Sequence, residues 1–163
     1  PFDEIQDPQG LNMPGLNLSR DPCRTPMQWD DRAWSGFSEV KPWLRVADNY
    51  RRINVQAQKL NALSMLNFYK RLIELRQQES ALHAGEYRSL TSDRQLIAYM
   101  RTDQESRFVI VLNMSHRPCF FLPPGFELRG TIELSTEPEH TGVEANGSIA
   151  LGGDEGLIIR LKN

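Results

Sequence analysis

The hydrophobic and polar residues of this chain follow three different patterns in succession. From residue 1 to about residue 59, prolines and glycines recur too often to allow a helical period, so this stretch is predicted to be dominated by loops. From about residue 62 to residue 78, apolar residues recur at helical spacing. After Leu82, short apolar runs alternate with turn residues, which is typical of strands. The patterns predict an α+β chain with a helix-ended first part and a separate all-β module, divided near His83.

The predicted helix has one wide apolar side. Its other face is polar and carries Lys70, Arg71, Glu74 and Gln77. A stripe wider than a single seam is typical of a helix that packs against more than one neighbour, so we interpret this helix as core scaffold. The stripe consists of Met65, Leu66, Phe68, Tyr69, Leu72, Ile73, Leu75 and Arg76.

Seven short strands are predicted in the second part of the chain. They are expected at residues 85–90, 96–101, 107–113, 119–122, 131–135, 148–151 and 156–161. Asn146-Gly147 fits a two-residue type I′ hairpin, because both central positions of that turn need a positive φ. Short strands at this spacing predict an antiparallel sandwich or barrel.

The loop-dominated first part contains an unusual number of aromatic residues. Such residues could line a pocket, but they more often anchor a loop by burying apolar area, and burial is the prediction here. The residues are Trp29, Trp34, Phe37, Trp43 and Tyr50.

Composition narrows the classes of partner. Hydrophobic residues make up 39% and charged residues 25% of the 163, as in globular domains. A net charge of −2 provides no basic field, so neither nucleic acid nor an anionic membrane is an expected partner. No apolar run approaches the ~18 residues of a membrane span, and no signal peptide opens the chain, so we expect a cytoplasmic protein. The chain starts at Pro1 rather than at a methionine, so its visible start need not be the natural one.

The residues themselves assemble no complete catalytic or metal site. Cys23 and Cys119 match no metal or redox spacing, and we expect two reduced thiols. The histidines are single and scattered, so no metal ligand set and no cofactor is predicted. The adjacent carboxylates Asp30-Asp31 and Asp154-Glu155 point in different directions, and Asp154-Glu155 is interpreted as a solvated pair in a turn.

The segment 19–31, SRDPCRTPMQWDD, is the densest in polar ligand-binding groups. It resembles a segment of glycoside hydrolase family 13, in the α-glucosidase and oligo-1,6-glucosidase branch. The resemblance continues through residues 36–37, 41–44, 49–50, 53–55 and 58, and through LNFYKRLIELR at 66–76, which is similar to the last helix of that family's barrel. Gln6-Asp7-Pro8 and Pro14-Gly15-Leu16 also resemble the family's approach to this segment.

The resemblance implies a fold and a division into domains. The family has a (β/α)8 barrel followed by a small antiparallel β domain. Residues 1–82 would be the last barrel loop and helix, and residues 83–163 the C-terminal β-sandwich domain. The catalytic aspartate, the glutamate acid and the second aspartate of the family come earlier in such a chain, so no catalytic residue is assigned here.

The resemblance also implies two substrate-binding residues. Arg20 matches the arginine that reaches the sugar beside the nucleophile, a role that suits a permanently charged, forked group. Asp21 would hold Arg20 or cap the next turn. The alternative is that Arg20 only pairs with Asp21 or another carboxylate of the loop.

The leading hypothesis is the C-terminal part of a retaining α-glucosidase that acts on short α-linked gluco-oligosaccharides. Its partners would be that oligosaccharide and the remainder of its own barrel, and the fragment alone is expected to be inactive. Trehalose synthases and sucrose isomerases share the segment and remain alternatives. A non-catalytic heavy subunit of an amino-acid transporter is a further alternative, and a stand-alone carbohydrate-binding module is disfavoured because the aromatic residues of the predicted strands suit the core.

Overall fold

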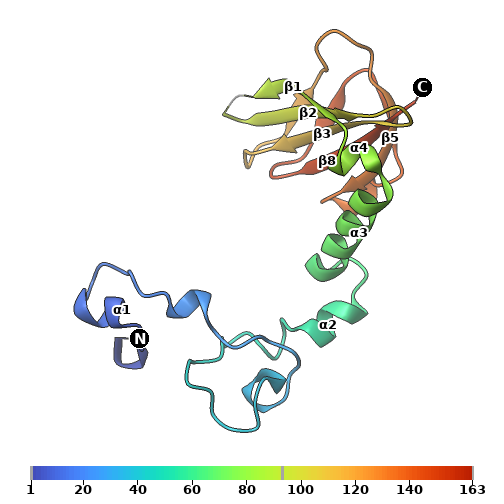
Figure 1. Ribbon diagram of the computed structural model, residues 1–163. Coiled ribbons are helices and arrows are strands. Elements are labelled where there is room, and N and C mark those ends of the chain that lie inside the picture. The colour runs from blue at the N-terminus through green and yellow to red at the C-terminus, as the bar shows by residue number, and fades with distance from the viewer. Residues whose placement is uncertain (1, 93, 163) are drawn as a thin grey trace. The chain divides into compact units, whose positions relative to one another are not determined.

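Figure 1 shows the computed structural model of the chain, which describes residues 2–92 and 94–162. The chain divides into two compact units, residues 1–67 and 68–163. The boundary falls inside the longest helix, α3 (Met65–Gln78), near the start predicted from the helical period. Each unit is described by itself.

The first unit contains little regular structure, as its prolines and glycines predict. It consists of short helical elements joined by loops. They are η1 (Phe2–Glu4), α1 (Pro8–Asn12), η2 (Asp21–Cys23), η3 (Ala33–Gly36) and α2 (Val55–Leu60).

Side-chain hydrogen bonds cap helix α2 and connect the loops of this unit. Asn54 precedes α2 and its side chain accepts the Ala57 N–H at 2.8 Å, so a donor at the helix start is satisfied. The amide of Gln28 reaches from the candidate segment to Asn49 Oδ1 at 3.0 Å and to the Ile53 carbonyl at 2.7 Å. The segment 19–31 is thereby tied to the loop that leads into α2.

The second unit is built on a six-stranded antiparallel sheet in the order β1-β2-β3-β8-β5-β6 (Figure 1). A second sheet contains β4 and β7. The short helices α4 (Ser80–His83) and η4 (Pro138–His140) complete the unit. The strands are β1 (Glu86–Ser92), β2 (Leu96–Thr102), β3 (Arg107–Asn113), β4 (Cys119–Phe121), β5 (Arg129–Ser135), β6 (Glu144–Asn146), β7 (Ile149–Leu151) and β8 (Gly156–Leu161).

The six-stranded sheet buries side chains on both faces. On one face, Val111 and Ile159 pack in a cluster with Phe121 of β4 and Leu151 of β7, which makes the sandwich. On the other face, Phe108 and Ile110 pack against α4, with Leu75 of α3 beside them. Helices therefore cover one face of the sheet and the small sheet covers the other, which confirms the α+β fold class.

Two expectations at this level are wrong, and one strand was not predicted. Asn146-Gly147 is no type I′ hairpin: Asn146 lies in β6, only Gly147 has a positive φ, and β6 and β7 belong to different sheets. Strand β6 itself was not predicted. Phe120 and Tyr87 are exposed rather than buried in the core. The expectation of two reduced thiols is confirmed for Cys23 and Cys119.

The apolar stripe of α3 is only partly buried. Leu66, Phe68, Leu72 and Leu75 are half-buried. An outward stripe at four-residue spacing is more than half exposed, and it consists of Met65, Tyr69 and Ile73.

Candidate functional site

Asp7 ties the candidate segment to the start of the chain. Its carboxylate caps α1 by accepting the Gln9 N–H at 3.4 Å, and Pro8 takes the first helical position, where no N–H is needed. Gly10 of the same helix faces Ser19, and a Cβ at Gly10 would come within 2.7 Å of the Ser19 Cβ. The helix α1 therefore packs closely against the beginning of the segment 19–31.

Arg20 makes a two-pronged ion pair with Asp7. Nη2 of Arg20 lies 2.8 Å from Oδ1, Nε lies 3.1 Å from Oδ2, and the Arg20 backbone N–H donates to Oδ2 at 2.8 Å. The Asp7 side chain is 1% exposed, whereas that of Arg20 is 54% exposed. The side-chain hydrogen bonds from Arg20 hold the pKa of Asp7 well below its usual range, and the same contacts raise the pKa of Arg20.

Asp21 binds the same earlier segment through its backbone. Its Oδ2 accepts the N–H of Gln6 at 2.8 Å and that of Asp7 at 3.1 Å. The hydrogen bond from Gln6 is the largest cause of the lowered pKa of Asp21. The Asp7 carboxylate accepts from Arg20, and the Asp21 carboxylate accepts from Gln6 and Asp7, so each segment holds the other. We call this arrangement the Asp7–Arg20–Asp21 clasp.

The structure places both predicted site residues in the clasp but does not pair them with each other. Of the two expectations, that Asp21 holds Arg20 or that it caps the next turn, neither describes its hydrogen bonds. The partner of Arg20 is Asp7, which corresponds to the alternative of another carboxylate in the loop. The role of Asp7 was not predicted, although Gln6-Asp7-Pro8 belongs to the family resemblance and an aspartate before a proline is typical of a helix start.

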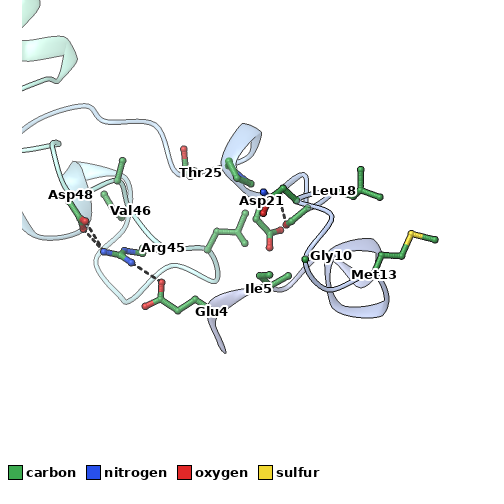
Figure 2. A pocket seen from close by; sticks show the side chains of 16 residues that line it. Glu4, Ile5, Gly10, Met13, Leu18, Asp21, Thr25, Arg45, Val46 and Asp48 are labelled. Carbon is green, nitrogen blue, oxygen red and sulfur yellow. Dashed lines mark hydrogen bonds and ion pairs between the residues drawn. The ribbon is translucent and has the colours of Figure 1, made fainter. Parts of the chain in front are cut away.

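A cavity of about 740 Å³ lies beside the clasp (Figure 2). Asp21 is one of its lining residues, and Arg20 is not. Its other lining groups include apolar side chains such as Ile5, Leu18 and Val46. At one side, Arg45 bridges Glu4 at 3.1 Å and Asp48 at 2.7 Å, as the dashed lines in Figure 2 show. The Asp48 hydrogen bonds are the first cause, and Glu4 the second, of the raised pKa of Arg45.

A left-handed turn follows the candidate segment. Trp34, Ser35 and Gly36 have φ values of 55°, 57° and 64°, and non-glycine residues rarely adopt such values. The Ser35 carbonyl accepts the N–H groups of Trp29 at 2.9 Å and Asp30 at 3.1 Å, which holds the turn in place.

The aromatic residues of this first unit are not buried as predicted. In the described structure of the unit, Trp29, Trp34, Phe37 and Trp43 are exposed, and Tyr50 is half-buried. The prediction that they anchor the loop by burial is therefore wrong for those four.

Glu155 corrects the prediction of a solvated Asp154-Glu155 pair. Glu155 is 1% exposed and lies within 2.7 Å of its hydrogen-bond partners Ser135 Oγ, His140 Nδ1 and Gly152 N. Asp154 is exposed and pairs with His116 at 2.7 Å. These contacts connect turns of the second unit, and we assign them a structural role.

Among the described residues, no cluster of three or more histidine, cysteine, aspartate or glutamate side chains is arranged to hold a metal ion. No helix in the described part of the chain is both long enough and apolar enough to span a bilayer.

Comparison with known proteins identifies a protein family whose members are similar to this chain. A family model for the α-amylase catalytic domain matches residues 2–85. The probable oligo-1,6-glucosidase 3 of Bacillus subtilis (strain 168) is 38% identical over 124 residues, which cover 73% of this chain and 22% of the relative. The oligo-1,6-glucosidase of Bacillus cereus is 33% identical over 147 residues, or 88% of this chain and 26% of the relative.

Solved structures give a consistent result. The isomaltulose synthase PalI of Klebsiella sp. LX3 matches with a TM-score of 0.81 and 31% identity, over 88% of this chain and 26% of that one. The trehalulose synthase MutB of Pseudomonas mesoacidophila MX-45 matches with a TM-score of 0.80 and 33% identity over the same shares. The chain therefore spans about a quarter of the length of these relatives.

Proposed function

Because the chain belongs to glycoside hydrolase family 13, the α-amylase family, we propose that it is the C-terminal part of a retaining α-glucosidase acting on short α-linked gluco-oligosaccharides. The oligo-1,6-glucosidases among its relatives support this substrate class. The reaction would run through a covalent glycosyl-enzyme, with a nucleophile and an acid supplied by the rest of the protein.

The observation that carries the proposal is that one edge of the Arg20 guanidinium is fixed and the other is open. Within the described residues its Nη1 has no hydrogen-bond partner, while Nε and Nη2 are fixed by Asp7. A charged donor held in place and half exposed is suited to sugar hydroxyls. We assign Arg20 as a substrate contact and Asp21 as the residue that keeps its loop closed beside the cavity.

The partner we propose for the chain itself is the remainder of its barrel. The outward stripe of α3 and the exposed aromatic residues of the first unit are apolar surface of the kind that a neighbouring layer covers. The division at residues 1–82 and 83–163 is part of this proposal, which draws support from the match of the family model to residues 2–85. A cytoplasmic location stays a prediction.

A second candidate is sucrose isomerisation. It is favoured by the similarity to an isomaltulose synthase and a trehalulose synthase. The clasp would then hold the glucosyl unit in the same way, and residues outside this chain would decide between water and fructose as the acceptor.

Activity assays test the proposal. The isolated chain should not hydrolyse an aryl α-glucoside, and measurable turnover would refute the assignment as a part that lacks the catalytic carboxylates. In the longer protein that carries this segment, Arg20→Ala should lower kcat/KM by roughly thirtyfold to several hundredfold, since a charged hydrogen bond is lost. Product analysis with sucrose and isomaltose separates the two candidate reactions.

A further inference from the structure

We propose that Asp7 is the positioning residue for Arg20 and holds its guanidinium so that the Nη1 edge is left for a sugar hydroxyl. This inference rests on the proposed sugar contact of Arg20 and gives a role to Asp7, to which the family resemblance assigns none.

The first argument is which donors Asp7 occupies. The carboxylate takes one side of the guanidinium, with Oδ1 on Nη2 at 2.8 Å and Oδ2 on Nε at 3.1 Å. The guanidinium has five N–H donors in a rigid plane, so fixing two of them fixes the direction of the other three. Those three include both N–H groups of Nη1, which lie on the edge that Asp7 leaves open.

The second argument is the difference in burial between the two partners. The Asp7 side chain is almost fully enclosed, and the Arg20 side chain is about half exposed. The buried carboxylate therefore fixes one edge of the guanidinium, while the other edge of the guanidinium stays accessible to solvent. An exposed pair, by contrast, would sample many geometries.

The third argument is that Asp7 is itself held from several directions. It caps α1, its N–H donates to Asp21, and its Oδ2 also accepts the backbone N–H of Arg20. The carboxylate therefore fixes the backbone and the side chain of Arg20 together. A side chain ordered before the ligand arrives loses less conformational entropy on binding.

A double-mutant cycle in the longer enzyme tests the proposal. The variants are Asp7→Asn, Arg20→Ala and the double variant, each assayed for kcat, KM and thermal midpoint. Asp7→Asn should lower kcat/KM by about a hundredfold, because a misplaced contact group costs about that much. In the Arg20→Ala background the same change should have little further effect, since its action runs through Arg20.

The chain offers a closely matched control. Asp30 accepts from the backbone N–H, Nε and Nη2 of Arg32 at 3.0, 2.9 and 2.6 Å, which are the same three donor groups on a different arginine, with Nε and Nη2 sharing Oδ2. Asp30→Asn removes an equivalent aspartate–arginine pair from the first unit and should leave kcat/KM unchanged.

The outcomes separate the inference from the proposed function. If Arg20→Ala is harmless, the sugar contact is wrong and the role of Asp7 falls with it. If Arg20→Ala is damaging but Asp7→Asn lowers only the thermal midpoint, or adds its full effect in the double variant, the positioning role alone is refuted. Should Asp7→Asn fail to fold, Asp7→Glu keeps the charge but displaces the fork, and wild-type kinetics in that variant would equally overturn the proposal.

Discussion

At the residue scale, Glu155 shows how a buried carboxylate is kept charged. Burial favours its protonated form, but the N–H of Gly152, the hydroxyl of Ser135 and His140 all hydrogen bond to it. The balance lowers the pKa of Glu155 from its ordinary value of 4.5. A carboxyl group whose pKa is lower in the folded state than in the unfolded state stabilises the fold above the unfolded pKa.

The pH dependence of stability follows from this shift. The contribution of Glu155 should be complete above about pH 5 and should be lost as the pH falls below 4.5 through the lowered folded pKa. Glu155→Gln should lower the free energy of unfolding by about 1–3 kcal/mol near pH 7 and flatten its decline in acid, because hydrogen bonds to a buried charge are lost. Denaturant unfolding between pH 3 and 7 measures the free energy of unfolding and its decline in acid. Glu105→Gln, at an exposed position, is the control. An acid decline as steep as in the wild type would contradict the assignment.

Gly36 is the second residue whose substitution gives a definite expectation. Its φ is +64°, and a Cβ there would overlap the carboxylate of Asp30. Gly36→Ala should therefore open the left-handed turn at a local cost of at least about 1 kcal/mol. Hydrogen exchange of the Trp29 and Asp30 amides, which donate to Ser35 O, should speed up accordingly. Gly15→Ala separates backbone strain from the clash with Asp30, because Gly15 also has a positive φ of +82° but open space where a Cβ would lie. A similar acceleration of amide exchange around Gly15 in that variant would refute the clash as the cause.

At the scale of elements, Arg160 of β8 joins the helices to the sheet. Its guanidinium lies 2.6 Å from Glu79, which follows α3, and 2.5 Å from Glu133 of β5, and it stacks 4.6 Å above the Phe108 ring. These carboxylates raise the pKa of Arg160. Arg160 is 35% exposed, so solvent weakens each ion pair but leaves the stacking in place.

The contribution of this junction can be measured with one pair of variants. Arg160→Met should destabilise the second unit by about 1–2 kcal/mol, as two partly screened ion pairs and a cation–π contact are removed. Arg129→Met removes the exposed ion pair between Arg129, the first residue of β5, and Glu127 just before that strand, and should change the unfolding free energy by less than about 0.5 kcal/mol. Equal effects of the two substitutions would show that the network around Arg160 adds nothing.

Elements with a strong period were predictable, and contacts across loops were not. The helix α3 follows from its apolar spacing, and seven strands follow from alternation and turn residues. The strand β6 escaped because only Ala145 in it is buried, so its three residues show no pattern. The motif around Arg20 indicated the site, but its partner Asp7 lies 13 residues earlier and depends on the path of the loop. The burial of Glu155 is likewise invisible in a turn-like sequence.

At the scale of the whole molecule, the outward stripe of α3 is apolar surface that lies exposed in the described structure. Met65, Tyr69 and Ile73 lie on one side of the helix at four-residue spacing, and each is more than half exposed. Contiguous apolar surface of this kind promotes association between molecules. Under the proposed function the same stripe would be covered by the rest of the barrel.

Charged substitutions in the stripe should therefore affect the stability of the isolated chain and that of the longer protein differently. Tyr69→Glu with Ile73→Lys places a favourable Glu–Lys pair at four-residue spacing, so the unfolding free energy of the isolated chain should stay within about 0.5 kcal/mol. Its self-association, measured by sedimentation velocity, should fall because the apolar stripe is broken. In the longer protein the same substitutions should lower stability by several kcal/mol, since burying a Glu–Lys pair in an apolar layer costs more desolvation energy than the pair regains. Leu75→Lys is the control, because Leu75 packs toward the sheet and its loss should destabilise both forms. Unchanged stability of the longer protein would mean that the barrel does not cover this side of α3.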